Sequence, residues 1–339
     1  MNLKDLCFEL AAQEGVSGCE NNAAEIARKH LEKYMKTHTD RLGNVIGSTE
    51  GKGQHILLDA HLDSIGLVVK GFDENGFVLF DKVGGMDLRV LTGAEVIIHG
   101  KEEIFGVVCS VPPHLSKNDD KKLDISTMAI DIGYDKKTAT ELLSVGDRIT
   151  LRNFQYELLG DKLSSGAFDD RSAVAAILYA LELTKGKLNN IHLSVMFSSR
   201  EEVGGSGAKT GAFSLQPDYS LVVDVGFGDD AYTPSNETIK LGKGASIGIS
   251  PILDDEFTKE LVSLAKEKQI PYQHDVMGRS TGTNADSITI AGCGVKTALL
   301  SIPLRYMHTA NEIISLKDIE YTAKLIAEYL LKKEVQYNA

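Results

Sequence analysis

Five short stretches of the sequence carry an acidic or imidazole side chain where an apolar run ends or a helix begins. In open α/β sheets, such strand ends are where sites are built. Mixed imidazole and carboxylate ligands suit zinc, cobalt or manganese. Two such ions about 3.5–4 Å apart need a bridging carboxylate and roughly two further protein ligands each. The stretches supply that number, and their candidate residues are His61 and Asp63 in "LLDAHLD", Asp169 in "SGAFDDR", Glu201 and Glu202 in "SSREEVGG", Asp224 in "LVVDVG" and His308 in "RYMHTANE".

The adjacent glutamates Glu201 and Glu202 are the most unusual of these features. They follow the apolar run "HLSVMF", which is typical of an interior strand, and glycines come directly after them. Neighbouring carboxylates repel each other, and buried charge is costly unless it is paired or bound to a metal. The pair therefore indicates either a solvated turn or a site for a cation.

Each candidate also has a structural explanation when it is taken alone. His61 could be a core histidine, and Asp169 could cap the helix that follows it. Glu201 and Glu202 could lie in a solvated turn, Asp224 could be a turn residue, and the histidine of "RYMHTANE" could lie in an ordinary loop. The occurrence of five such stretches in one chain favours a shared metal site over five unrelated features.

The elements that must position these residues fall into two patterns. Helical and strand signals alternate before residue 67 and after residue 160, which predicts an α/β domain with a mixed central sheet flanked by helices, formed by residues 1–66 and 161–339. Between them, residues 67–160 read as short strands separated by turns, with one helix at "KKTATELL". This segment predicts a small all-β barrel or sandwich inserted into the α/β domain.

Composition excludes several other classes of protein. The chain has 339 residues, of which 42% are hydrophobic, and a net charge of −12, which argues against a nucleic-acid partner. No apolar segment approaches the roughly 20 residues of a membrane span, and the first residues lack the parts of a signal peptide. We therefore expect a cytoplasmic protein without a membrane partner. The four cysteines show no CxxC spacing, so no thiolate zinc site is predicted.

The ordered set "AHLDSIG", "GAFDDRSA", "REEVGGSGA", "VVDVG" and "PLRYMHTANEII" resembles the M42 family of metallo-aminopeptidases. This is the group of glutamyl and tetrahedral aminopeptidases, and some members are labelled endoglucanases. The resemblance extends over essentially the whole chain and implies a metallo-exopeptidase-like fold. "GTNADS" also resembles a loop that the family places near its site, although a turn with an Asn cap would explain it equally.

The resemblance implies a role for each candidate residue. His61 and Asp224 would hold one divalent ion, Glu202 and His308 would hold a second, and Asp169 would bridge them. Zinc or cobalt would be expected, with manganese as a further candidate.

The two remaining candidates would act beside the ions. Asp63 would accept a hydrogen bond from the far nitrogen of His61, and Glu201 would be the general base. The chain departs from the family at Ser64, where glutamate is usual, and in the run "VGGSGA", where a bulky or basic residue is more usual. Neither position is a ligand, so both bear on the substrate pocket or on subunit contacts.

The function expected from this reading is removal of N-terminal residues from short peptides by metal-activated water. The resemblance also implies homo-oligomers, built from dimers joined through the inserted domain and closing into a dodecamer. Three alternatives stay open at this stage: a related metallo-carboxypeptidase or deacylase, a glycosidase, and a non-enzymatic assembly protein. A glycosidase is disfavoured because adjacent residues rarely provide the carboxylate separation of about 5 Å or more that it needs.

Overall fold

Four apolar segments form the parallel centre of an eleven-stranded sheet in the computed structural model, which describes residues 1–112 and 124–338. The strands are buried over most of their length on both faces, which explains their near-continuous runs of Val, Leu and Ile. In spatial order they are β12 (Ile191–Ser198), β3 (Lys52–His61), β13 (Tyr219–Phe227) and β16 (Lys296–Arg305).

Shorter strands extend this sheet on both sides. β2 pairs antiparallel with β12, and β17 and β14 pair antiparallel with β16. The flanking strands are β1 (Lys36–Thr39), β2 (Val45–Ser48), β17 (Glu312–Ser315), β11 (Lys162–Ser165), β10 (Tyr156–Glu157), β14 (Ala245–Ile249) and β15 (Tyr272–Val276).

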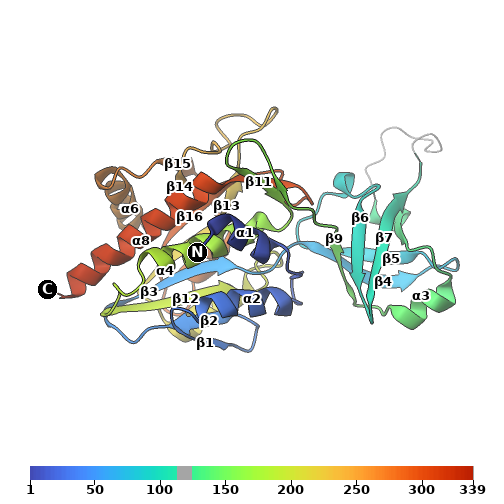
Figure 1. Cartoon of the computed structure of the whole chain (residues 1–339), viewed down its shortest axis with the longest axis horizontal. Coiled ribbons are helices and arrows are strands. Elements are labelled where there is room, and N and C mark those ends of the chain that lie inside the picture. Colours follow the sequence, from blue (N-terminus) through green and yellow to red (C-terminus); the bar gives the residue numbers. More distant parts are fainter. Residues whose placement is uncertain (113–123, 339) are drawn as a thin grey trace.

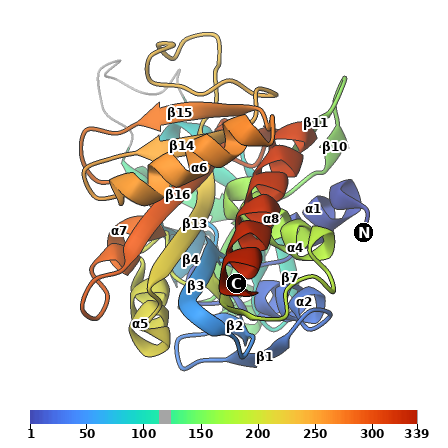
Figure 2. The same cartoon turned by 90° about the vertical axis from the view of Figure 1, so that its left-hand side faces the viewer.

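Helices cover both faces of the sheet. Because side chains alternate along a strand, Val223 of β13 packs in the larger core with α4, whereas Val222 packs in a second core with α5 and α7. Figure 2 shows α4 and α8 on one side of the central strands and α5 and α7 on the other. The helices of this part are α1 (Leu3–Ala11), α2 (Asn21–Leu31), α4 (Phe168–Leu183), α5 (Ser206–Leu215), α6 (Asp255–Glu267), α7 (Asn284–Thr289) and α8 (Leu316–Asn338).

A closed antiparallel barrel stands beside the α/β part (Figure 1). Its strand order is β4–β5–β8–β7–β6–β9, and it encloses its own apolar core. Its elements are β4 (Gly66–Phe72), β5 (Val78–Val83), β6 (Glu95–His99), β7 (Glu103–Ser110), β8 (Met128–Asp131), α3 (Lys136–Leu142) and β9 (Arg148–Leu151), with short 3₁₀ turns at Leu88–Val90 and Ile125–Thr127. The predicted fold class, a mixed α/β sheet with a small all-β unit, is confirmed.

Two helices were not expected from the sequence. α5 follows the double glutamate and is rich in glycine and serine, which are poor or neutral helix formers, and α7 lies in the "GTNADS" stretch. Both are stabilised by packing on the sheet, where Ala208 and Ala285 are fully buried. Within the described residues, no helix has the length and apolar character needed to cross a membrane.

The parallel strands explain why the candidate residues meet. β3 ends at His61, Glu201 and Glu202 follow the end of β12 at Ser198, and Asp224 lies near the end of β13. Parallel neighbours present these ends at one edge of the sheet. The barrel begins at Gly66, a few residues after His61, so it stands next to that edge.

Candidate metal centre

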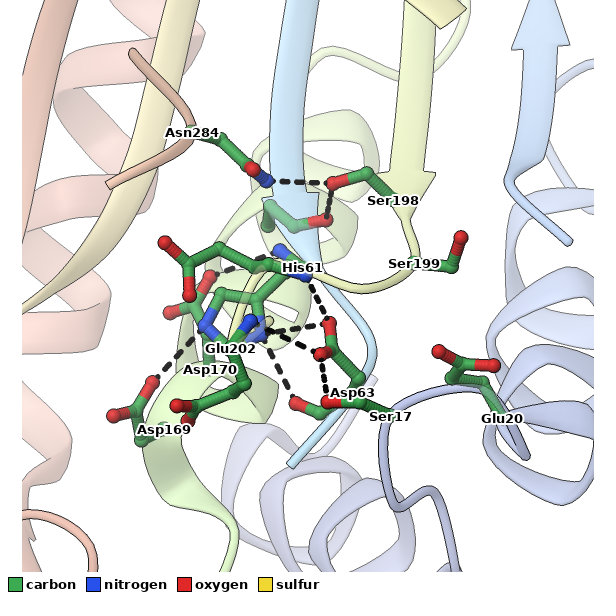
Figure 3. A network of polar contacts seen from close by, with 12 residues as sticks. Ser17, Glu20, His61, Asp63, Asp169, Asp170, Ser198, Ser199, Glu202 and Asn284 are labelled. Atoms are coloured by element: carbon green, nitrogen blue, oxygen red, sulfur yellow. Dashed lines mark hydrogen bonds and ion pairs between the residues drawn. The ribbon is translucent and has the colours of Figure 1, made fainter. Parts of the chain in front are cut away.

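His61 is the most enclosed of the candidate ligands. It is 1% exposed, and its Nε2 lies 3.0 Å from Oδ1 of Asp169 and 4.0 Å from Oδ1 of Asp224. Its Nδ1 donates to the backbone carbonyl of Asp63 at 3.0 Å, with the Asp63 carboxylate 3.5 Å away. Figure 3 shows the ring between Asp63 and Asp169, so Nε2 is directed into the cluster.

Asp169 connects the two histidines. Its Oδ1 contacts His61, and its Oδ2 lies 3.3 Å from Nε2 of His308. The residue belongs to the first turn of α4, where its non-helical backbone turns the carboxylate into the cluster; the peptide bond to Asp170 is cis. Burial raises the pKa of Asp169, but contacts with His308 and His61 outweigh it and hold that pKa below its usual range.

His308 and Glu202 form the other side of the cluster. Nε2 of His308 lies 3.2 Å from Oε1 of Glu202, and its Nδ1 donates to the backbone carbonyl of Gly85 at 2.7 Å. Gly85 belongs to the barrel part of the chain, so a barrel backbone group fixes the orientation of this ring. Burial lowers the pKa of His308, but Asp169 and Glu202 raise it to about 11.

Asp170 was not predicted to belong to the site. Its Oδ2 accepts the backbone N–H of His61 at 3.2 Å, and its other oxygen is buried without a hydrogen-bond partner among the described residues. One ligand atom each from His61, Asp170 and Asp224 lies within 4.8 Å of the others. Burial and the neighbouring Asp224 raise the pKa of Asp170 well above its usual range. Its position in the "DDR" sequence was the available signal, but a helix-capping role explains two aspartates equally well.

Asp63 has a different main contact from the one predicted. Its carboxylate accepts the backbone N–H groups of Glu201 at 2.9 Å and Glu202 at 3.1 Å, and the hydroxyl of Ser17 at 2.5 Å. The bond from Nδ1 of His61 goes to its carbonyl rather than to its carboxylate. Asp63 therefore anchors the turn that presents the double glutamate.

Glu201 lines the cleft beside the cluster. Burial raises the pKa of its carboxyl group to about 7; among its neighbours, His61 lowers that pKa, whereas Glu202 and Asp169 raise it. A carboxylate with a pKa near neutrality can both accept and return a proton at pH 7, which suits a general base. The solvated-turn explanation of the double glutamate is wrong, because both side chains take part in a largely buried cluster.

Two further polar groups support the site from behind. Glu312 accepts the backbone N–H groups of His308 at 3.0 Å and Asp169 at 3.1 Å. Asn284, from the "GTNADS" stretch, donates to Asp59 at 3.0 Å and to Ser198 at 2.8 Å beneath the end of β3 (Figure 3). Glu312 was not predicted, and its bond to Asp169 joins residues 143 apart in the sequence, which leaves no local pattern. The "GTNADS" stretch was expected near the site from the family resemblance, but no role was predicted for Asn284.

The donor set fits divalent cations. Burial raises the pKa of Asp224 and Asp170 well above the usual range, and nearby carboxylates add to the effect. An orphaned oxygen of Asp170 and two imidazole nitrogens, of His61 and His308, point into the same cluster. Oxygen and imidazole donors together are the ligands that zinc, cobalt and manganese accept. Cations held there would offset the repulsion among these carboxylates.

Comparison with known proteins gives consistent results. The M42 glutamyl aminopeptidase family matches residues 43–325. Lysyl aminopeptidase of Pyrococcus furiosus is 31% identical over 339 residues, covering 97% of this chain and 96% of that protein. The TET aminopeptidase of Thaumarchaeota archaeon SCGC AB-539-E09 has a TM-score of 0.93 at 28% identity, covering 99% of each chain.

The TET1 peptidase of Pyrococcus horikoshii, which can assemble into a tetrahedron or a large octahedral shell, has a TM-score of 0.85 at 30% identity and covers 97% of this chain and 99% of its own. These similarities include the α/β part and the barrel alike, because they cover nearly the whole of each chain. Residues 43–325 also contain all seven candidate site residues, from His61 to His308. The chain therefore belongs to the M42 glutamyl aminopeptidase family.

Proposed function

We propose that this aminopeptidase uses two divalent metal ions to remove N-terminal residues from short peptides with water. The observation that carries the proposal is the position of Asp169, whose two oxygens face His61 and His308 separately. A carboxylate with one oxygen facing His61 and the other facing His308 is placed to bridge two ions, one held near each histidine. If His61 were only a core histidine and Asp169 only a helix cap, this arrangement would not be required.

The ligands divide into two pairs around Asp169. His61 and Asp224 would hold one ion, and Glu202 and His308 would hold the other; zinc or cobalt is expected, with manganese also accepted by such ligands. When bound, such ions act as Lewis acids and lower the pKa of water towards neutrality.

Glu201 performs the proton transfers in this proposal. Its carboxylate accepts a proton from the attacking water and returns it to the departing amine after the peptide bond breaks. The hydrogen bonds from the amides of Glu201 and Glu202 to Asp63 hold the base and its neighbouring ligand in a fixed relation. Because Nδ1 of His61 donates to a carbonyl, its Nε2 is left as the ligand atom.

Membership of the M42 family favours an aminopeptidase over the carboxypeptidase, deacylase, glycosidase and non-enzymatic alternatives. We expect aminoacyl reporter substrates with a free amine to be cleaved by the purified protein supplied with zinc, cobalt or manganese. Their N-acetylated counterparts should be resistant, because an aminopeptidase requires the free amine. Preferential cleavage of the acetylated substrates would instead support a deacylase.

Glu201→Gln tests the assignment of the base. The substitution keeps the size and shape of the side chain but removes its ability to accept a proton, so kcat should fall by roughly 10²-fold or more. Metal content, measured by inductively coupled plasma mass spectrometry, should stay that of the wild type. A variant that loses metal would show that Glu201 is a ligand instead.

Asp169→Ala tests the bridge. The variant should lose at least one metal ion per chain and nearly all activity, because the remaining ligands no longer share a carboxylate. Simple loss of a helix cap predicts only about 1 kcal/mol of lost stability with activity kept. Metal analysis combined with thermal unfolding separates these outcomes, and full turnover would leave the capping explanation standing.

We further propose that residues 67–160 act in assembly and restrict access to the site. The barrel exposes apolar side chains at Leu79, Phe105 and Val145, and the similar TET1 peptidase of Pyrococcus horikoshii forms closed shells. A homo-oligomer built from dimers, up to a dodecamer, would admit short peptides only.

Light scattering coupled to size exclusion should therefore find a large homo-oligomer. Replacing the barrel within this segment, residues 67–151, with a Gly/Ser linker should give smaller particles, because the proposed contact surface is gone. The linker leaves β10 in place, since that strand pairs with β11 in the α/β sheet. Particle size is measured instead of activity, because removing the barrel also removes the carbonyl of Gly85 that orients His308 and so could change the site itself. A wild-type protein that is monomeric at micromolar concentration would remove the assembly role.

A further inference from the structure

The cleft beside the metal centre contains a partly buried carboxylate that the proposed reaction does not use. The cleft has a volume of about 910 Å³ and is lined by His61, Asp169, Glu201 and Asp224 on one side and by the β15 segment on the other. Asp275 belongs to β15 and lies in this lining. It is only partly exposed, whereas the other charged side chains outside the metal cluster are exposed, namely Glu237, His274 and Arg279.

Asp275 lies next to Gly226 of β13, the strand that also carries Asp224. A Cβ atom built on Gly226 would lie 3.6 Å from its Oδ2. Gly226 is two residues after Asp224 on β13, so both face the same side of the strand. Two residues along a strand span about 6.6 Å, so this is the separation of Asp224 and Gly226 along β13. The separation is close to the length of a lysine side chain. The same Cβ on Gly226 would lie 2.9 Å from Cδ1 of Ile239 and 3.1 Å from Cβ of Ser301, so the carboxylate of Asp275 packs with these side chains around Gly226 near the end of β13.

The carboxylate of Asp275 has no hydrogen-bond or ion-pair partner within residues 1–112 and 124–338. Burial therefore raises the pKa of Asp275, since nothing nearby stabilises the charged form. A partly buried carboxylate without a partner loses part of its hydration without compensation. A cationic group brought by a ligand would supply the missing partner.

Apolar side chains form part of the walls of this cleft. Phe227 is 65% exposed and Val276 is 72% exposed, and Met277 and Leu299 line the same cavity. A lysine or arginine side chain combines an aliphatic stem with a charged end. The stem would cover these apolar surfaces while the charged end reached Asp275.

We propose that Asp275 selects peptides whose N-terminal residue carries a basic side chain, lysine or arginine. This inference rests on the proposed function, because it places the N-terminal residue next to Asp224 with its side chain directed along the cleft. The carboxylate forms a charge-assisted hydrogen bond with the cationic end. Asp275 is thus a specificity residue and takes no part in bond breaking.

Reporter substrates with N-terminal lysine, arginine, leucine and glutamate test the proposal on the metal-loaded protein. The wild type should cleave the lysine and arginine substrates with the highest kcat/KM. Asp275→Asn should lower the ratio of kcat/KM for lysine to that for leucine by about 10- to 100-fold, mostly through KM, because a charged hydrogen bond is lost. Asp275→Glu, which keeps the charge, should restore most of the ratio.

Glu237→Gln is the matched control, since it removes one negative charge from the exposed rim of the same cleft. Its lysine-to-leucine ratio should stay within about twofold of the wild type, because exposed charges interact weakly through water. A wild type without preference for basic residues, or an equal loss on lysine and leucine substrates in Asp275→Asn, would overturn the proposal. The equal loss would mean that Asp275 binds the α-amine instead.

Calorimetric binding of lysinamide and leucinamide to the metal-loaded protein distinguishes failure of this inference from failure of the proposed function. The protein could cleave no reporter but bind lysinamide more tightly than leucinamide, with this preference lost in Asp275→Asn. That result contradicts the proposed function and supports the role of Asp275. Equal binding of the two amides contradicts the role of Asp275 whatever the activity.

Discussion

Repulsion among buried carboxylates is the constraint on which the rest of this structure depends. Asp169, Asp170, Glu202 and Asp224 meet at one edge of the sheet, where little water can screen them. In the protein alone, part of this charge is balanced by His61 and His308, whose pKa values lie above their usual range. The raised pKa values of Asp170 and Asp224 show that the balance is incomplete. In the proposed metal centre, divalent cations would complete it. Buried ion pairs are weak evidence for stability, so a metal centre explains the arrangement better than a stabilising network does.

The fold serves this constraint by bringing rigid elements to one place. Parallel strands β3, β12 and β13 end together, and α4 begins beside them. Backbone groups complete the positioning: Asp63 anchors the amides of Glu201 and Glu202, and the barrel carbonyl of Gly85 orients His308. The barrel therefore contributes to the geometry of the site, although none of the candidate ligands lies within it. The same edge opens into the cleft that contains Asp275, so the reacting groups and the proposed selectivity are supplied by strands of one sheet.

The sequence was informative where chemistry and periodicity coincide. Ligand-type residues at the ends of apolar runs predicted the cluster around His61, and alternating patterns predicted the α/β sheet and the all-β unit. It was less informative where tertiary packing decides. α5 has weak intrinsic helix propensity and forms because Ala208 packs on the sheet. The bonds of Asp63 to amides 138 and 139 residues away, and that of Glu312 to the amide of Asp169, carry no local signature. Asp275 belongs to no motif, and its significance comes only from its position in the cleft.

The central claim is that the carboxylate cluster exists to hold two metal ions that act together. Titration of the metal-free protein with cobalt, following bound metal and turnover in the same samples, tests it most directly. Two ions should bind per chain, and full turnover should require both. Full turnover with one ion per chain or with none would contradict it, because Asp169 would then have no second ion to bridge.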